Sequence, residues 1–234
     1  MPGLGFLPSP PDPRDHPLEL YVPRSAQRQV QREAPGTYIP WTPTMPVLDQ
    51  GESPKCVAYS AALASTIDER RDAHRTRLFD ADEGYARCKE RDGIPDIDGT
   101  YPRVMLDVKR ERGMLTLNTH RPHAIAAYAR LQSIEEILTA TFLYGSVVLG
   151  SVWYEEWFDV PANKTLPEGT FDAGGHAYLV VGWSNYKRAF LIQNSWGPAW
   201  GYRIGSTYGR AWLPWAHINF EGDWEAWRSI DAQQ

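Results

Sequence analysis

Cysteine is scarce in this chain, with only Cys56 and Cys88 among 234 residues. Two cysteines cannot build a disulfide framework, which fits a reducing compartment or a protein that does not rely on disulfides. No apolar run approaches the roughly 20 residues of a membrane-spanning helix. Residues 1–8 lack both the basic and the apolar region of a secretion signal. We therefore expect no membrane contact and a location in the cytoplasm or in an assembly such as a virion.

An excess of positive charge is absent too. The chain has 24 Lys and Arg against 29 Asp and Glu, a formal net charge of −5, so no electrostatic argument favours nucleic acid as a partner. The turn cluster at 92–99 lacks the ligand spacing and final glutamate of an EF-hand. His120 and His123 have no third ligand in sight. The sequence therefore predicts no metal site and no cofactor.

A helix is predicted from Cys56 to about Ala73, after a turn-rich segment. Its apolar residues recur on one face, at Val57, Ala61, Ala64 and Ile67. A cysteine in the first turn lies near the positive end of the backbone dipoles, which favours the nucleophilic thiolate over the thiol, and Lys55 adds a positive charge. Gln50 lies six residues upstream. Its amide N–H and the backbone N–H of Cys56 would together form an oxyanion hole.

A histidine and an asparagine far downstream supply the other groups that a thiolate needs. His176 stands at the start of an apolar run, and Asn194 ends a second one. The turn at 184–187 joins these two strands, so they are expected to pair as a hairpin. Both residues then fall near the same end, where the carboxamide accepts a hydrogen bond from the imidazole. Trp196 would shield that bond from water.

These motifs together resemble those of the papain family of cysteine peptidases (C1 type). They are Gln-Gly-x4-Cys, Gly-His-Ala-x-x-Val-Val-Gly and Asn-Ser-Trp-Gly-x-x-Trp-Gly, and they span roughly residues 40–215. The resemblance implies that Cys56 is the nucleophile and His176 the acid and base. It makes Asn194 the residue that orients the imidazole, Gln50 the oxyanion-hole glutamine and Trp196 the shielding tryptophan.

The same resemblance places the substrate. Gly99 and Thr100 fall where family members have the backbone edge that pairs with it, and Gly175 and Trp196 are the other expected substrate-binding residues. The chain departs from the family around the nucleophile: it reads Ser53-Pro54-Lys55-Cys56-Val57 where the family usually has Cys-Gly-Ser-Cys-Trp. Pro54 fixes φ and removes a donor, so we expect the loop to follow a different path.

Further helices are predicted at 80–91, 100–112 and 134–144, the last with a capping box at Ser133 and Gly145 as its C-cap. A buried strand is expected at 147–152. Helices therefore crowd into the first half and strands into the second, which predicts an α+β fold of two lobes. The resemblance implies a papain-like peptidase domain at 41–215: a helical lobe at roughly 50–135, an antiparallel sheet or barrel lobe at roughly 136–215, and the active-site cleft between them.

Residues 1–40 are rich in proline and predict an extended arm. The arm is either a surface strap or a remnant of the family's inhibitory propeptide, and the sequence leaves open whether it crosses the cleft. Residues 216–234 are expected to be a C-terminal tail. Its Trp224 and Trp227 either dock the tail on the body or form an interface patch. Arm and tail are thus the two candidate surfaces for a protein partner.

The function that the resemblance implies is hydrolysis of peptide bonds in polypeptide substrates through a thioester on Cys56. Two alternatives stay open. One is a catalytically weak or inactive papain-fold component of a larger assembly such as a virion, kept for binding. The other is a papain-like hydrolase that cuts cell-wall peptides.

Overall fold

The computed structural model describes residues 1–39, 45–73, 76–222 and 224–231. The predicted domain start at residue 41 lies outside these ranges. The helices are α1 (Arg24–Glu33), α2 (Cys56–Ala73), α3 (Ala81–Lys89), α4 (Pro102–Glu111) and α5 (Ile134–Tyr144), with 3-10 turns η1 (Leu18–Leu20), η2 (Glu155–Trp157) and η3 (Trp215–His217). None of the helices in the described ranges combines the length and the apolar composition needed to cross a bilayer.

The strands are β1 (Thr37–Tyr38), β2 (Met114–Leu115), β3 (Pro122–His123), β4 (Ala127–Leu131), β5 (Val147–Tyr154), β6 (Asp172–Ser184), β7 (Ala189–Gln193), β8 (Tyr202–Ile204), β9 (Thr207–Pro214) and β10 (Glu225–Ile230). The main sheet has the order β4-β10-β5-β6-β7-β9-β8, with β1 also paired to β6. All of its pairs between named strands are antiparallel. The expected hairpin is present as β6 and β7.

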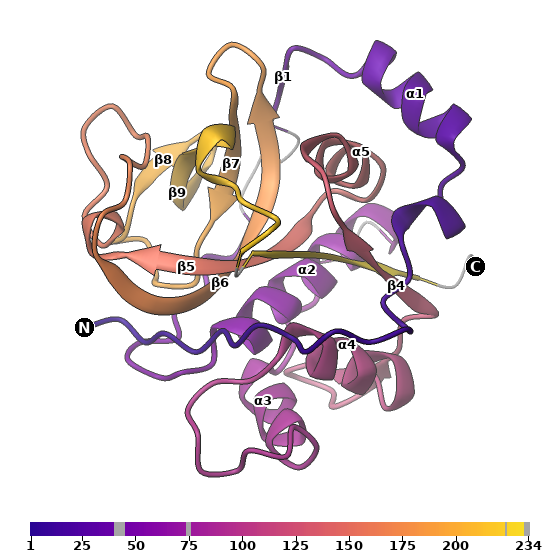
Figure 1. Cartoon of the computed structure of the whole chain (residues 1–234). Coiled ribbons are helices and arrows are strands. Elements are labelled where there is room, and N and C mark those ends of the chain that lie inside the picture. Colours follow the sequence, from indigo (N-terminus) through magenta and orange to yellow (C-terminus); the bar gives the residue numbers. More distant parts are fainter. Residues whose placement is uncertain (40–44, 74–75, 223, 232–234) are drawn as a thin grey trace.

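Helix α2 has the predicted bounds, and it runs against the sheet (Figure 1). The four residues of its predicted apolar face are all buried, because that face packs on the strands and on α3 and α4: they are Val57, Ala61, Ala64 and Ile67. The capping box of α5 is present too. Ser133 Oγ accepts from the backbone N–H of Glu136 at 3.1 Å, and Gly145 closes the helix with φ of 92°.

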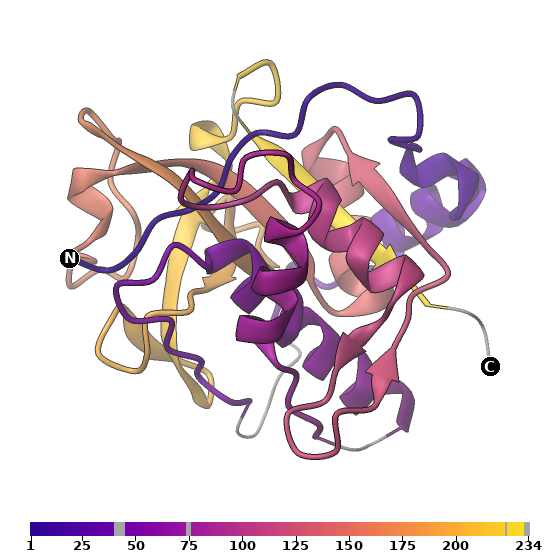
Figure 2. The ribbon, with the colours of Figure 1, turned by 90° about the horizontal axis from the view of Figure 1, so that it is seen from below.

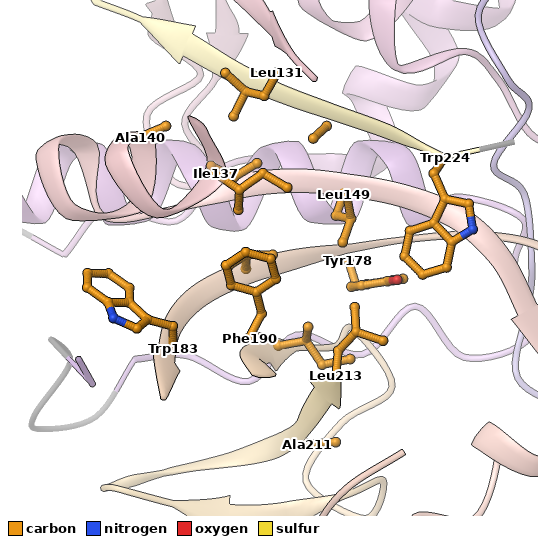
Figure 3. Packing of buried hydrophobic residues seen from close by; sticks show 14 of the residues in the cluster. Leu131, Ile137, Ala140, Leu149, Tyr178, Trp183, Phe190, Ala211, Leu213 and Trp224 are labelled. Carbon is orange, nitrogen blue, oxygen red and sulfur yellow. The ribbon is translucent and has the colours of Figure 1, made fainter. Parts of the chain in front are cut away.

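Aromatic and aliphatic side chains fill the space between α5 and the sheet. Figure 3 shows part of this cluster, with Leu131, Ile137, Ala140, Leu149, Tyr178, Phe190 and Leu213 among the labelled residues. A second cluster joins α2 to the sheet through Leu63, Ile67, Leu179 and Trp227. The two faces of the sheet are therefore both covered, and the helical lobe is fixed to the strands that carry the expected histidine and asparagine.

The C-terminal segment differs from the predicted tail. Strand β10 lies inside the sheet, between β4 and β5. Trp224 and Trp227 are 4% and 0% exposed, so they are core residues and not an interface patch. The lobe limits also differ, because strand β4 precedes residue 136 and helix α5 spans it. A strand whose partners lie some 75–100 residues upstream gives no local signal of its pairing.

The arm is only partly extended. Leu18, Val22 and Val30 are buried, and α1 lies beside α5 (Figure 1). Pro23 is the N-cap of α1. Proline is tolerated there because the first N–H groups of a helix have no intrahelical partner. Residues 1–17 are free of helix, and this first part of the arm runs along the interface of the two lobes in both views (Figures 1 and 2).

Candidate active site

Cys56 is the first residue of α2, and its side chain is completely buried. Cys56 packs in one cluster with Phe6 of the arm and Ala177 of β6. Ala177 directly follows His176. The helix tip of one lobe and the strand of the other therefore meet near Cys56.

His176 and Asn194 lie together at the same end of the hairpin. His176 Nε2 and Asn194 Oδ1 are 2.8 Å apart, and both residues are fully buried. Asn194 Oδ1 also accepts from the backbone N–H of Ser195 at 2.7 Å, which fixes the orientation of the amide. The ring of Trp196 stacks on the imidazole, with centroids 4.3 Å apart and planes 26° apart. Trp196 thus covers the bond that the sequence expects it to shield.

Gln50 reaches the same region from the loop before α2. Its Nε2 donates to the carbonyl of Gly3 at 3.1 Å and to that of Ser53 at 2.7 Å. Its Oε1 accepts from Ser195 Oγ at 2.7 Å, and its backbone N–H donates to the Ser195 carbonyl at 2.8 Å. Ser195 therefore orients the amide of Gln50. Sequence reasoning overlooked it, although it stands between Asn194 and Trp196 in the motif.

The first residues of the arm occupy the site itself. The backbone N–H groups of Gly5 and Phe6 donate to the Gly175 carbonyl at 2.9 and 3.0 Å. Thr100 donates to the Gly5 carbonyl at 3.0 Å and accepts from Leu7 at 3.2 Å. The Gly3 carbonyl accepts from Trp196 Nε1 at 3.3 Å as well as from Gln50. We call residues 3–7 the plug.

The plug touches every residue expected to bind substrate: Gly99, Thr100, Gly175 and Trp196. Two glycines allow this close approach. A Cβ on Gly3 would lie 2.0 Å from the Ser53 carbonyl oxygen, and one on Gly5 would lie 2.1 Å from that of Pro54. Both are backbone atoms that cannot move aside. The backbone of the plug therefore lies where the resemblance places the substrate.

With the plug in place, Cys56 is not the thiolate that the sequence predicts. Burial raises the pKa of the Cys56 thiol to about 12, although the N–H groups around the sulfur act in the opposite direction. Burial lowers the pKa of His176 to about 3, and the bond to Asn194 offsets only part of this. Among the described residues, His176 Nδ1 has no hydrogen-bond partner. Both side chains are thus held neutral while the plug is in place.

The residues near Cys56 that differ from the usual papain-family sequence have partners in their immediate surroundings. Lys55 Nζ forms an ion pair with Asp82 at 2.9 Å, so its charge is shared with α3. The Pro54 carbonyl borders the plug at Gly5.

In the turn cluster at 92–99, Asp92 Oδ2 accepts from Lys89 Nζ at 2.8 Å and from Thr100 Oγ1 at 3.1 Å. That carboxylate therefore fixes the edge on which the plug lies.

Acid is expected to loosen the plug. The pKa of His176 is about 3 when covered, whereas an uncovered imidazole titrates near 6.5. The covered state binds fewer protons between these values, so the contribution of His176 to the stability of the covered state is complete above pH 6.5. This contribution falls by about 1.4 kcal/mol per pH unit as the pH falls through this window. Protection factors of the Gly5, Phe6 and Leu7 amides should fall about tenfold per unit, while those of Leu191 in β7 stay constant. Constant protection of the plug between pH 6.5 and 4.5 would contradict this linkage.

Solved structures with a similar course of the chain identify the fold. The chain is similar to xylellain, a cysteine protease from Xylella fastidiosa, with a TM-score of 0.80 and 22% identity over 99% of this chain and 97% of the other. The chain has the papain-like fold. ProCathepsin B S9 from Trypanosoma congolense is also similar, with a TM-score of 0.71 and 16% identity over 99% and 87%. So is the Carica candamarcensis cysteine protease CMS1MS2 in complex with E-64, with a TM-score of 0.60 and 16% identity over 81% and 94%.

The matches found by sequence cover a much smaller part of the chain than the structural matches do. No protein-family model matches the chain. A stretch of 77 residues, 32% of this chain, is 30% identical to cathepsin B-like cysteine proteinase 5 of Caenorhabditis elegans. Another alignment of 77 residues is 31% identical to an uncharacterized peptidase C1-like protein of Acanthamoeba polyphaga mimivirus. The matches span only 22% and 24% of these two relatives.

Proposed function

We propose that this papain-like chain is a cysteine peptidase that cleaves polypeptides through a thioester on Cys56. One observation carries the proposal. Strand β6 bears His176, which is paired with Asn194, and the next residue of the strand, Ala177, packs with Cys56 at the tip of α2. In the proposal Cys56 is the nucleophile, His176 the base and Asn194 the group that orients the base, the set of groups that nucleophilic catalysis requires.

The roles follow from which atoms are free. With the plug withdrawn, His176 Nδ1 is the nitrogen available to take the proton of Cys56, because Nε2 is engaged by Asn194. The thiolate then attacks a peptide carbonyl, and the imidazolium gives its proton to the leaving amine. Water, activated by the neutral imidazole, hydrolyses the thioester. Gln50 Nε2 and the Cys56 backbone N–H donate hydrogen bonds to the oxyanion. By analogy with the oxyanion hole of another protease, each donor lowers the activation free energy by about 3–4 kcal/mol.

The plug inhibits this reaction in our proposal. The Gly3 carbonyl accepts the hydrogen bond of Gln50 Nε2, and residues 5–7 pair with the backbone of Gly175 and Thr100. The oxyanion donor and the expected substrate-binding edge are therefore both occupied while the plug is in place. This favours the propeptide-like interpretation of the arm over that of a plain surface strap.

Active-site labelling tests the proposal. The purified chain should hydrolyse a fluorogenic peptide once the plug is displaced, and an epoxide of the E-64 type should stop turnover by alkylating Cys56. Cys88 is the internal control, since its thiol is also buried and burial raises its pKa to about 12. Turnover should vanish in Cys56→Ala and persist in Cys88→Ala.

Two results would redirect the assignment. Equal labelling of both cysteines, with no turnover in any variant, would leave a papain-fold binding component, an option that the complete cover of Cys56 keeps open. Release of peptide fragments from purified peptidoglycan, without cleavage of polypeptides, would indicate a cell-wall peptide hydrolase instead.

A further inference from the structure

An aromatic side chain that the motifs do not contain lies against the imidazole. Trp153, on β5, is completely buried, and its ring centroid is 4.8 Å from that of His176 with planes at 78°. It also contacts Trp196, at 5.0 Å and 80°. Since Trp196 stacks on His176, Trp153 stands perpendicular to both members of that stack.

The register of the sheet explains why the indole reaches this place. Ser151 pairs with His176 across β5 and β6, and Trp153 pairs with Gly174. Residues directly opposite each other, and those two further along, project from the same face of a sheet. Gly174 has no side chain, so the space diagonal to His176 is open for a large ring. Trp153 fills it.

The imidazole is consequently held in three ways. Asn194 tethers Nε2, Trp196 covers one face, and Trp153 stands beside the ring. The tether alone leaves the ring free to swing about it. The indole occupies the space into which the ring would swing, and it excludes water from there. Tight packing of this kind matters, because a displacement of about 1 Å in a catalytic group can cost about 100-fold in rate.

We propose that Trp153 is a positioning residue for His176, keeping Nδ1 directed at the sulfur of Cys56. The inference rests on the proposed function for its effect on rate, but its geometric content does not need turnover. A smaller side chain at this position should leave the fold intact and release the imidazole. An aromatic substitute should retain most of the restraint.

The test compares Trp153→Leu, Trp153→Phe and Trp157→Phe in the full chain. Trp157 is the matched control: its ring packs on Trp153 at 5.3 Å, and its Nε1 donates to the Pro167 carbonyl at 2.9 Å. Its replacement therefore perturbs the same cluster and removes a buried hydrogen bond. NMR follows the exchange of the His176 ring N–H and the pKa of the imidazole, and peptide turnover gives kcat and KM.

In Trp153→Leu the ring N–H should exchange about tenfold faster or more, and the pKa should rise towards the ordinary value. Its kcat should fall about 10- to 100-fold, with KM within about twofold. Trp153→Phe should recover most of both readouts, and Trp157→Phe should match the parent. Unchanged exchange and kcat in folded Trp153→Leu would overturn the proposal, as would an equal effect in Trp157→Phe. All turnover is measured with the plug displaced; if even then the parent chain hydrolyses no peptide, the proposed function fails and the NMR readout alone decides the role of Trp153.

Discussion

Replacing Gly3 and Gly5 by valine in the full chain is expected to raise the rate of Cys56 alkylation by an E-64-type epoxide about 100-fold or more. Neither valine fits, because each Cβ would lie within 2.1 Å of a backbone carbonyl oxygen. Five backbone hydrogen bonds hold residues 3–7 in place, each worth about 1 kcal/mol. Losing three of these bonds suffices for the effect, since every 1.4 kcal/mol is tenfold in an equilibrium constant.

Gly36→Val is the matched control for this experiment. It lies in the same N-terminal region, and a Cβ there meets no atom within 4 Å, so its alkylation rate should equal that of the parent chain. Peptide hydrolysis should rise with alkylation in the double valine variant. An unchanged alkylation rate in a folded double variant would show that the plug does not limit access to the sulfur.

The rest of the arm should stay bound in that variant, so the experiment isolates the plug. Arg103 forms an ion pair with Asp15, and Arg130 approaches the same carboxylate at 3.4 Å. The Ser9 N–H donates to the buried carboxylate of Glu225 at 2.6 Å. These contacts lie beyond residue 7 and do not depend on it. The arm is thus an anchored segment with a separable end in the cleft.

Asp68→Ala is expected to lower the free energy of unfolding by about 3–5 kcal/mol. Asp68 Oδ1 and Arg228 Nη2 are 2.7 Å apart, and the two side chains are 7% and 4% exposed. Removing the carboxylate leaves a buried guanidinium without its counter-ion, which is the costly way to break such a pair. For a chain of 234 residues the melting temperature should fall by about 6–20 °C.

Asp72→Ala controls for the loss of a negative charge on the same helix, because Asp72 is exposed. It should change the free energy of unfolding by no more than about 0.5 kcal/mol. Chemical denaturation of both variants measures the difference. A loss below about 1 kcal/mol in Asp68→Ala would mean that the pair which joins α2 to β10 contributes little to holding the two lobes together.

Local patterns were sufficient for several elements. The apolar face of α2, the capping box at Ser133 and the β6–β7 hairpin each depend on residues close in sequence, and each is present. Of the four residues picked out by the motifs, His176 and Asn194 are in contact, and Gln50 is bonded to Ser195, the neighbour of Asn194. Such signals are readable because periodicity, capping and turn chemistry act over a few residues.

The sequence by itself therefore determined which reactive side chains are present, and that a helix carries the cysteine while a β-hairpin carries the histidine and the asparagine. Only the tertiary structure decided that Gly3 and Gly5 enter the cleft, that β10 is inserted into the sheet, and that Trp153 packs on His176. Each of these depends on contacts between segments far apart in the chain, whose register no local pattern encodes. The charge state of Cys56 belongs here too. A helix tip favours the thiolate, but burial under the plug outweighs it, because desolvation disfavours the charged form of a thiol.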